Sequence, residues 1–251
     1  MIRIGAAGWI IPRALADRFP GSGSSLQRYA ARLDAAEINS TFHRPHRPET
    51  FARWAASVPA GFRFSVKLPR AITHDKRLLD AAGPLACFID SIRHLEDRLG
   101  AVLVQLPPSL IFDPDIAGAF FRQLRDVFDG FVVCEPRHPT WFDANSDELL
   151  RSNQVGRVRA DPARVPEAAS PGGWTNLAYW RLHGSPRMYY SEYSTEFLRT
   201  LASKVGASAS SETWCIFDNT ACGAALGNAL MLSDQLNSNR CGASTINQAD
   251  G

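Results

Sequence analysis

Three ionisable residues follow a short hydrophobic run in the middle of the chain. The run is Phe131–Cys134, and Glu135, Arg137 and His138 come directly after it. A run of this length and composition is typical of a strand that is buried on both faces. Glutamate and histidine can transfer protons, and arginine binds carboxylates or phosphates through its fork of N–H groups. The segment therefore indicates a rigid strand with chemically active side chains at its C-terminal end.

Charged and amide side chains recur at the ends of other short apolar runs. One run carries Glu37 and Asn39, and the next carries Lys67. Because alternate side chains of a strand point to opposite faces, the polar members of a run share one face and residues such as Ile38 and Trp180 share the other. We expect the following side chains to point toward one axis: Glu37, Asn39, Ser65, Lys67, Gln105, Glu135, Arg137, Arg159, Asp161, Tyr179, Arg181 and His183.

These residue types suggest an anion-binding site with acid–base chemistry. Cations and amides bind a phosphate or carboxylate, and a glutamate whose pKa is raised by burial can shuttle protons. The candidate catalytic residues are Glu135, Glu37, His138 and Asp161. The candidate ligand-binding residues are Asn39, Lys67, Arg70, His74, Gln105, Arg137, Arg181, His183 and Asn219.

A second alternative is a divalent-metal site, as in metal-dependent isomerase and nuclease barrels. The chain offers suitable ligand types, namely Glu37, His74, Glu135, Asp161, His183 and Asp218. Many cations share these positions and would repel a metal, and no closely spaced pair of ligands is present. We therefore rank this alternative second, assign no metal ligand, and expect neither a cofactor nor a metal requirement for folding.

Two further alternatives involve no chemistry. The chain could recognise an anionic metabolite or a nucleic-acid end, but nucleic acid is not favoured because only one basic segment is present and the net charge is +2. Alternatively, Glu37, Arg137 and Arg181 could form a structural ion-pair network inside the protein. Whether the chain is an enzyme therefore stays open, and an anionic small molecule is the expected partner.

The hydrophobic pattern predicts eight strands that alternate with helices. The strands are expected at 2–7, 35–39, 62–68, 101–106, 131–134, 155–161, 177–183 and 214–217. The helices are expected at 25–33, 48–57, 84–99, 115–128, 147–152, 195–204 and 221–236, with Gly100 ending the third. This alternation predicts an α/β protein, a single (β/α)8 TIM-type barrel. A doubly wound open sheet is the alternative, but Gly5–Trp9 does not match its glycine-rich phosphate loop.

Length and composition agree with one soluble domain. The chain has 251 residues, which suits a barrel over 1–236, and its small polar end at 237–251 is expected to be a disordered tail. The five cysteines show no zinc-finger or CxxC spacing, which suggests reduced thiols and a cytoplasmic location. No secretory signal is evident, and no apolar run approaches the roughly 18 residues of a membrane span, so no membrane partner is expected. No pattern specifies an oligomeric state.

Five segments in order resemble the YecE-like family, a group of bacterial and archaeal proteins classed as a domain of unknown function. The resemblance runs from about Ile4 to Leu232. It implies a single TIM-type barrel and implies no particular activity. The matching segments are Glu37–Phe42, Lys67–Leu78 with its Pro69-Arg70 and Ile72-Thr73-His74, Gln105–Ser109, Glu135–Trp141 and Arg181–Gly184.

The chain departs from the family pattern at four places. Ala6-Ala7 and Ile10-Ile11 replace hydroxyl-bearing residues around the first loop, and His43 replaces a tyrosine. Asp218-Asn219 stands where two asparagines are common. The first loop has therefore lost hydroxyl groups that could bind a ligand, and the additional carboxylate of Asp218 could change the ligand preference.

Overall fold

Short apolar runs form the strands of one sheet in the computed structural model, which describes residues 1–246. The strands are β1 (Ile2–Ala7), β2 (Ala35–Ile38), β3 (Arg63–Lys67), β4 (Leu99–Gln105), β5 (Phe131–Glu135), β6 (Val155–Arg157), β7 (Arg159–Asp161), β8 (Gly172–Gly173), β9 (Leu177–Leu182) and β10 (Glu212–Phe217). Their order in the sheet is β7-β9-β10-β1-β2-β3-β4-β5-β6-β8.

The two ends of this sheet meet at Val158. Strand β6 pairs with β5, and β7 pairs with β9, so the predicted sixth strand is split and joins both ends of the sheet. Strand β10, the last strand, pairs with β1, the first. Pairing is parallel throughout except for the short strand β8, which runs antiparallel to β6. The sheet is therefore a nearly closed barrel, and the predicted TIM-type fold is confirmed.

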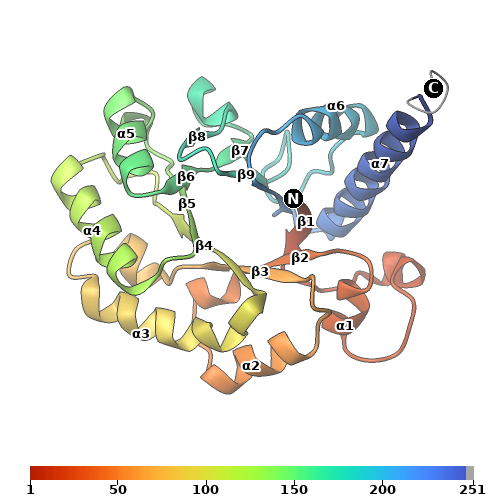
Figure 1. The fold of residues 1–251 in the computed structure, drawn as a ribbon, viewed down its shortest axis with the longest axis horizontal. Coiled ribbons are helices and arrows are strands. Elements are labelled where there is room, and N and C mark those ends of the chain that lie inside the picture. The colour runs from red at the N-terminus through yellow and green to blue at the C-terminus, as the bar shows by residue number, and fades with distance from the viewer. Residues whose placement is uncertain (247–251) are drawn as a thin grey trace.

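Helices surround the outside of the strands (Figure 1). They are α1 (Ser25–Ala30), α2 (Pro48–Ala56), α3 (Ala82–Ile92), α4 (Pro114–Val127), α5 (Ala144–Ser152), α6 (Thr195–Gly206) and α7 (Ala224–Ile246). Shorter 3₁₀ or π turns are η1 (Arg13–Arg18), η2 (Ser40–Phe42), η3 (Ala71–Asp75), η4 (Arg93–Arg98), η5 (Pro139–Trp141) and η6 (Pro166–Ala169). Between β7 and β9 the described chain forms η6 and β8 in place of an α-helix.

Two hydrophobic layers follow from the alternation of side chains along each strand. Ile38, Val66 and Trp180 pack in the outer layer with helix residues such as Phe121. Tyr179 and seven other buried residues fill the barrel interior, namely Ala35, Leu103, Val133, Val158, Leu177, Trp214 and Ile216. The predicted orientation of β2, β3 and β9 is therefore confirmed, and their alternate polar residues face the axis.

The predicted orientation of the sixth strand is wrong. Arg159 pairs with Trp180 and Asp161 pairs with Leu182, and paired residues in a sheet share a face. Both partners belong to the outer layer, and the Arg159 guanidinium lies 6.0 Å from the centre of the Trp180 ring. Val158 occupies the interior position instead. Its apolar side chain fixes the alternation, so the charged residues on either side point outward.

Two predicted boundaries also change. The third predicted helix ends at Ile92, and Gly100 lies within β4 rather than at a helix end. A side chain at Gly100 would lie 2.5 Å from the Trp214 ring, so glycine is needed there for packing against the barrel interior. At the C-terminus, α7 continues to Ile246 and so includes 237–246, the first part of the predicted disordered tail. Residues 247–251 of the predicted tail lie outside the described residues.

The side chain of Tyr29, from α1, bridges β1 and β2. Its hydroxyl accepts a hydrogen bond from the Ala6 amide (2.8 Å) and donates one to the Ala35 carbonyl (2.7 Å). The side chain is completely buried. At the neighbouring Gly5, a Cβ atom would lie 2.0 Å from the Ala35 carbonyl oxygen, so this pair of strands tolerates no side chain there. Tyr29 therefore satisfies two backbone groups that water cannot reach.

We expect Tyr29→Phe to lower the free energy of unfolding by about 1–3 kcal/mol, because it leaves a buried N–H and a buried carbonyl without partners. Urea denaturation monitored by circular dichroism measures the change. Tyr190→Phe is the matched control because Tyr190 is 44% exposed. Equal stability of the two variants would contradict the bridging role.

Candidate functional site

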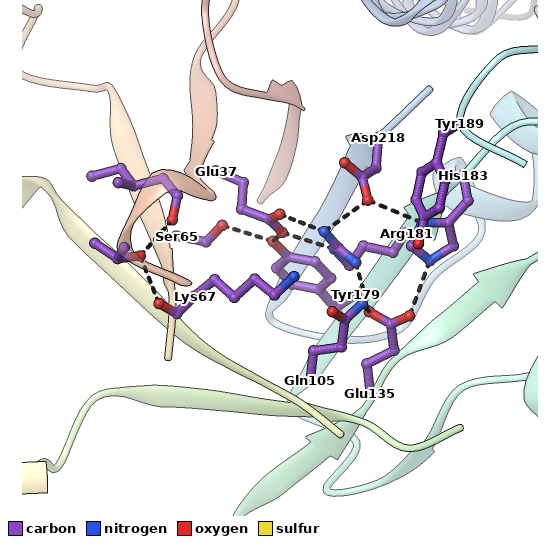
Figure 2. A network of polar contacts seen from close by, with 12 residues as sticks. Glu37, Ser65, Lys67, Gln105, Glu135, Tyr179, Arg181, His183, Tyr189 and Asp218 are labelled. Atoms are coloured by element: carbon purple, nitrogen blue, oxygen red, sulfur yellow. Dashed lines mark hydrogen bonds and ion pairs between the residues drawn. The ribbon is translucent and has the colours of Figure 1, made fainter. Parts of the chain in front are cut away.

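The guanidinium of Arg181, on β9, lies at the centre of the polar residues inside the barrel. It donates to both carboxylate oxygens of Glu37, from Nε (3.0 Å) and Nη2 (2.7 Å). It also donates from Nη1 to Glu135 (2.7 Å) and from Nη2 to Asp218 (3.0 Å). Figure 2 shows the three carboxylates converging on this one side chain. They come from β2, from the end of β5 and from the residue after β10.

This pairing keeps Arg181 charged inside the protein. The residue is completely buried, and burial by itself would lower its pKa. The carboxylates of Glu37, Asp218 and Glu135 outweigh that effect and hold the pKa of Arg181 well above its ordinary value. A buried charge is tolerated only when it is paired and hydrogen bonded, so the four side chains depend on one another.

Both ring nitrogens of His183 face carboxylates. Nε2 lies 3.0 Å from Glu135 Oε1, and Nδ1 lies 3.1 Å from Asp218 Oδ2. A neutral imidazole can donate only one hydrogen bond, whereas the imidazolium can donate to both carboxylates. Burial would lower the pKa of His183, but Glu135 and Asp218 raise it above its ordinary value. His183 is therefore held as a buried cation.

Glu135 accepts hydrogen bonds from four side chains. Besides Arg181 and His183, Arg137 binds Oε1 through Nε (3.1 Å) and Nη2 (3.0 Å), and Gln105 donates to Oε2 (3.1 Å). Burial by itself would raise the pKa of Glu135, but Arg137, Arg181 and His183 hold it well below its ordinary value. The prediction of a glutamate with a raised pKa is therefore wrong for Glu135. At neutral pH this residue is a carboxylate and cannot act as a general acid.

Glu37 is held by further residues on its other side. The Tyr179 hydroxyl donates to Glu37 Oε2 (3.1 Å) and lies 2.7 Å from the Ser65 hydroxyl. All three side chains are completely buried. The hydroxyl groups therefore extend the polar network from Arg181 toward β3.

Lys67 reaches the same region from the end of β3 without an ion-pair partner. The residue is 6% exposed, and no carboxylate of the described residues lies within 4.0 Å of its ammonium. Its Nζ atom lies 4.1 Å from the centre of the Phe42 ring. The Thr41 hydroxyl donates to the Lys67 carbonyl oxygen (2.6 Å), which fixes the backbone. Burial and the nearby Arg181 lower the pKa of Lys67 to about 8.

His74 packs against the same Phe42 ring as Lys67. The two aromatic rings lie 4.9 Å apart, centre to centre, and His74 Nδ1 lies 2.9 Å from the Thr73 hydroxyl. Burial, followed by the neighbouring cations Lys67, Arg70 and Arg137, lowers the pKa of His74 to about 4. His74 is therefore neutral at pH 7, in contrast to His183.

Comparisons with known proteins identify the family. A family model described as "Protein of unknown function DUF72" matches residues 3–249. The chain belongs to the DUF72 family. It is 29% identical over 177 residues to UPF0759 protein YecE of Escherichia coli strain K12. That match covers 68% of this chain and 62% of the length of the relative, which is less than two thirds.

Solved DUF72 structures have the same fold. A DUF72 family protein from Thermotoga maritima matches with a TM-score of 0.78 at 26% identity, over 94% of this chain and 99% of that chain. A DUF72 family protein from Enterococcus faecalis matches with a TM-score of 0.79 at 24% identity, over 94% of this chain and 96% of that chain. The resemblance to the YecE-like family is thus confirmed.

Six of the predicted site residues of this DUF72 protein form one network, and Lys67 and His74 adjoin it. The six are Glu37, Gln105, Glu135, Arg137, Arg181 and His183. Sequence reasoning considered Asp218 as a metal ligand and as a residue that could change the ligand preference, yet it binds both Arg181 and His183. The sequence does carry a signal for this position. Asp218 follows Trp214 and Ile216 at every second residue, and because those two side chains point into the barrel, the alternation predicts that Asp218 does so too.

Five predicted site residues lie apart from the network. His138 Nδ1 accepts from the Thr140 amide and so caps η5, and the Asp161 carboxylate accepts from the Tyr193 hydroxyl (2.8 Å) on the outer side of the barrel. Arg70 is exposed and pairs with Asp75 (3.1 Å). The remaining two are Asn39 and Asn219. Each has a buried Oδ1 atom that meets no hydrogen-bond partner among the described residues, and Asn219 is tied to Ser191 and Asn228.

The geometry does not favour the metal alternative. Arg181 lies among Glu37, Glu135 and Asp218, where a metal would have to bind. Within residues 1–246, no group of three or more potential ligands is arranged to hold a metal ion.

In the same part of the chain, no helix is long and apolar enough to cross a membrane.

We expect Glu135→Gln to lower the free energy of unfolding by about 3–5 kcal/mol, because it leaves buried cations without their counter-charge. Chemical denaturation at pH 7 measures the loss. Glu148→Gln is the control because Glu148 forms an exposed ion pair with Arg151, and such pairs contribute little. If Glu135→Gln were as stable as this control, the network would not be holding the fold together.

We expect the two site histidines to differ in protonation at pH 7. ¹⁵N NMR of the imidazoles should find both His183 nitrogens protonated and His74 neutral. Because folding raises the pKa of His183, its contribution to stability is present below the unfolded pKa of about 6.5 and is lost as pH rises through the folded value. Folding lowers the pKa of Glu135, so its contribution is lost as pH falls through the folded value. A neutral His183 at pH 6 would contradict the assignment.

Proposed function

We propose that this protein is an enzyme that binds a phosphate- or carboxylate-bearing small molecule at the C-terminal mouth of the barrel. The bound molecule is transformed by proton transfer. The catalytic ends of TIM-type barrel strands lie at this mouth, and Lys67, Gln105, Glu135 and Arg181 come from four different strands there.

The observation that carries the proposal is the ammonium of Lys67, which has no ion-pair partner in the part of the chain that the structure describes. The cations of the cluster are Arg181, Arg137, His183 and Lys67, whereas its carboxylates are Glu37, Glu135 and Asp218. One positive charge is therefore not compensated. A buried cation without a counter-charge is unfavourable, and an anionic ligand beside Lys67 would supply that charge.

We assign the acid–base work in this proposal to Lys67 rather than to the glutamates. A group transfers protons best when its pKa lies close to the working pH, and the pKa of Lys67 is about 8. Glu135 is committed to three cations, and Glu37 to Arg181. We infer that these two carboxylates orient Arg181 and His183. Binding of the anion without turnover is the alternative, and a search for product formation by the ligands that bind separates the two.

We expect anions to raise the melting temperature of the wild type and not of Lys67→Met. The screen uses inorganic phosphate, sugar phosphates and organic acids at constant ionic strength. A ligand at 100 times its Kd stabilises by about 2.7 kcal/mol, which corresponds to roughly 5–10 °C for a chain of this size.

Lys204→Met is the matched control, because Lys204 is exposed on α6. It should keep the full shift, including any general stabilisation by salts. Equal shifts in both variants, or no shift in the wild type, would contradict the proposal.

A further inference from the structure

We propose that the ε-amino group of Lys67 is a nucleophile that forms an imine with the carbonyl carbon of an aldehyde or ketone that carries a carboxylate or phosphate. This inference rests on the proposed function and names the substrate class of the same site. The carbonyl group of the substrate would face Lys67, and its acidic group would lie beside the neighbouring guanidinium groups of Arg137 and Arg181.

The first argument is how the buried cations of this chain are paired. Among the described residues the buried lysine and arginine side chains are Arg3, Arg157, Arg181 and Lys67. Arg3 pairs with Glu212 (2.5 Å), Arg157 with Asp147 (2.8 Å), and Arg181 with three carboxylates. Lys67 alone has no such pair among them, so its amino group is not committed to holding the fold.

The second argument is the choice of residue. The chain contains three lysines, Lys67, Lys76 and Lys204. The rest of its 27 lysine and arginine residues are arginines. Arginine does not lose its proton in proteins and cannot form an imine, whereas a desolvated lysine can do both. Among the described residues, arginine therefore stands at each buried structural ion pair and lysine at the one buried cationic position without a pair.

The third argument is reactivity. Imine formation needs the neutral amine, and the surroundings of Lys67 favour it. Burial and the nearby Arg181 bring the pKa of Lys67 to about 8, although the Phe42 ring 4.1 Å from the nitrogen favours the charged form. Roughly a tenth of the side chain is then neutral at pH 7, against about one part in 3,000 for an ordinary lysine.

The reaction balances without an oxidant or a further reactant. The lone pair of the amine attacks the carbonyl carbon, a C–N bond forms, and the carbonyl oxygen gains a proton to give a carbinolamine. The C–O bond then breaks and water leaves, so one amine and one carbonyl give one imine and one water. The two protons of the amine leave with the carbonyl oxygen as water.

Reductive trapping tests the inference directly. The full chain is incubated with sodium cyanoborohydride and, in turn, pyruvate, glyoxylate, glyceraldehyde 3-phosphate or pyridoxal 5′-phosphate. Peptide mass mapping then locates the adduct. At pH 7 we expect Lys67 to be modified about tenfold or more faster than Lys76 or Lys204, which are exposed. The rate should rise with pH through a midpoint near 8. Labelling of the Met1 amine is measured separately in the same maps.

Lys67→Arg separates this inference from the proposed function, because it keeps the cation and removes the nucleophile. It should lose the adduct and keep the thermal shift caused by anions, whereas Lys76→Arg and Lys204→Arg should keep both. If none of the four probes forms an adduct on Lys67, or if all three lysines are labelled equally, the imine is overturned. Anion binding still stands in that case if the anions raise the melting temperature. Loss of both signals in the wild type overturns both proposals.

Discussion

The buried charge of Arg181 is the constraint on which the rest of the site depends. The guanidinium is completely removed from water, so the fold must supply counter-charges. Glu37, Glu135 and Asp218 supply them from points far apart in the chain, and each reaches Arg181 within 3.0 Å. Only a closed arrangement of parallel strands brings these positions to one axis. Barrel closure and the network therefore stabilise each other.

The network also sets which groups can exchange protons. Cations around Glu135 hold its pKa low, and carboxylates around His183 hold its pKa high. Both residues are consequently fixed in their charged forms near neutral pH. The pKa of Lys67 is instead shifted toward neutral pH, because burial and the nearby Arg181 disfavour the protonated amine. The charged residues that the sequence indicates as catalytic thus form a structural network. The side chain whose pKa lies near neutral pH is the adjacent Lys67.

A structural ion-pair network and a functional site are often treated as alternatives for such residues. In this DUF72 protein the ion-pair network and the proposed anion site are neighbouring parts of one arrangement. Arg137, Arg181 and Glu37 are bound to partners inside the protein, as the structural reading expects. Lys67 lies against them without a carboxylate within 4.0 Å in the described chain. The network's excess of positive charge is what makes that position suited to an anion.

The sequence by itself determined the barrel and the inward face of most strands. The alternation of apolar residues sets that face in β2, β3 and β9, because one side of each strand packs against helices. The alternation did not predict the inward face of 155–161, because charged residues stand on both sides of Val158 and do not show which side chains point inward. The tertiary structure decided which charges meet, since alternation gives the direction of a side chain but not its neighbours across the barrel. Hence His138 was predicted to be catalytic and instead caps η5. The lack of a carboxylate beside Lys67 among the described residues follows from the closed barrel, in which Glu37, Glu135 and Asp218 all bind Arg181.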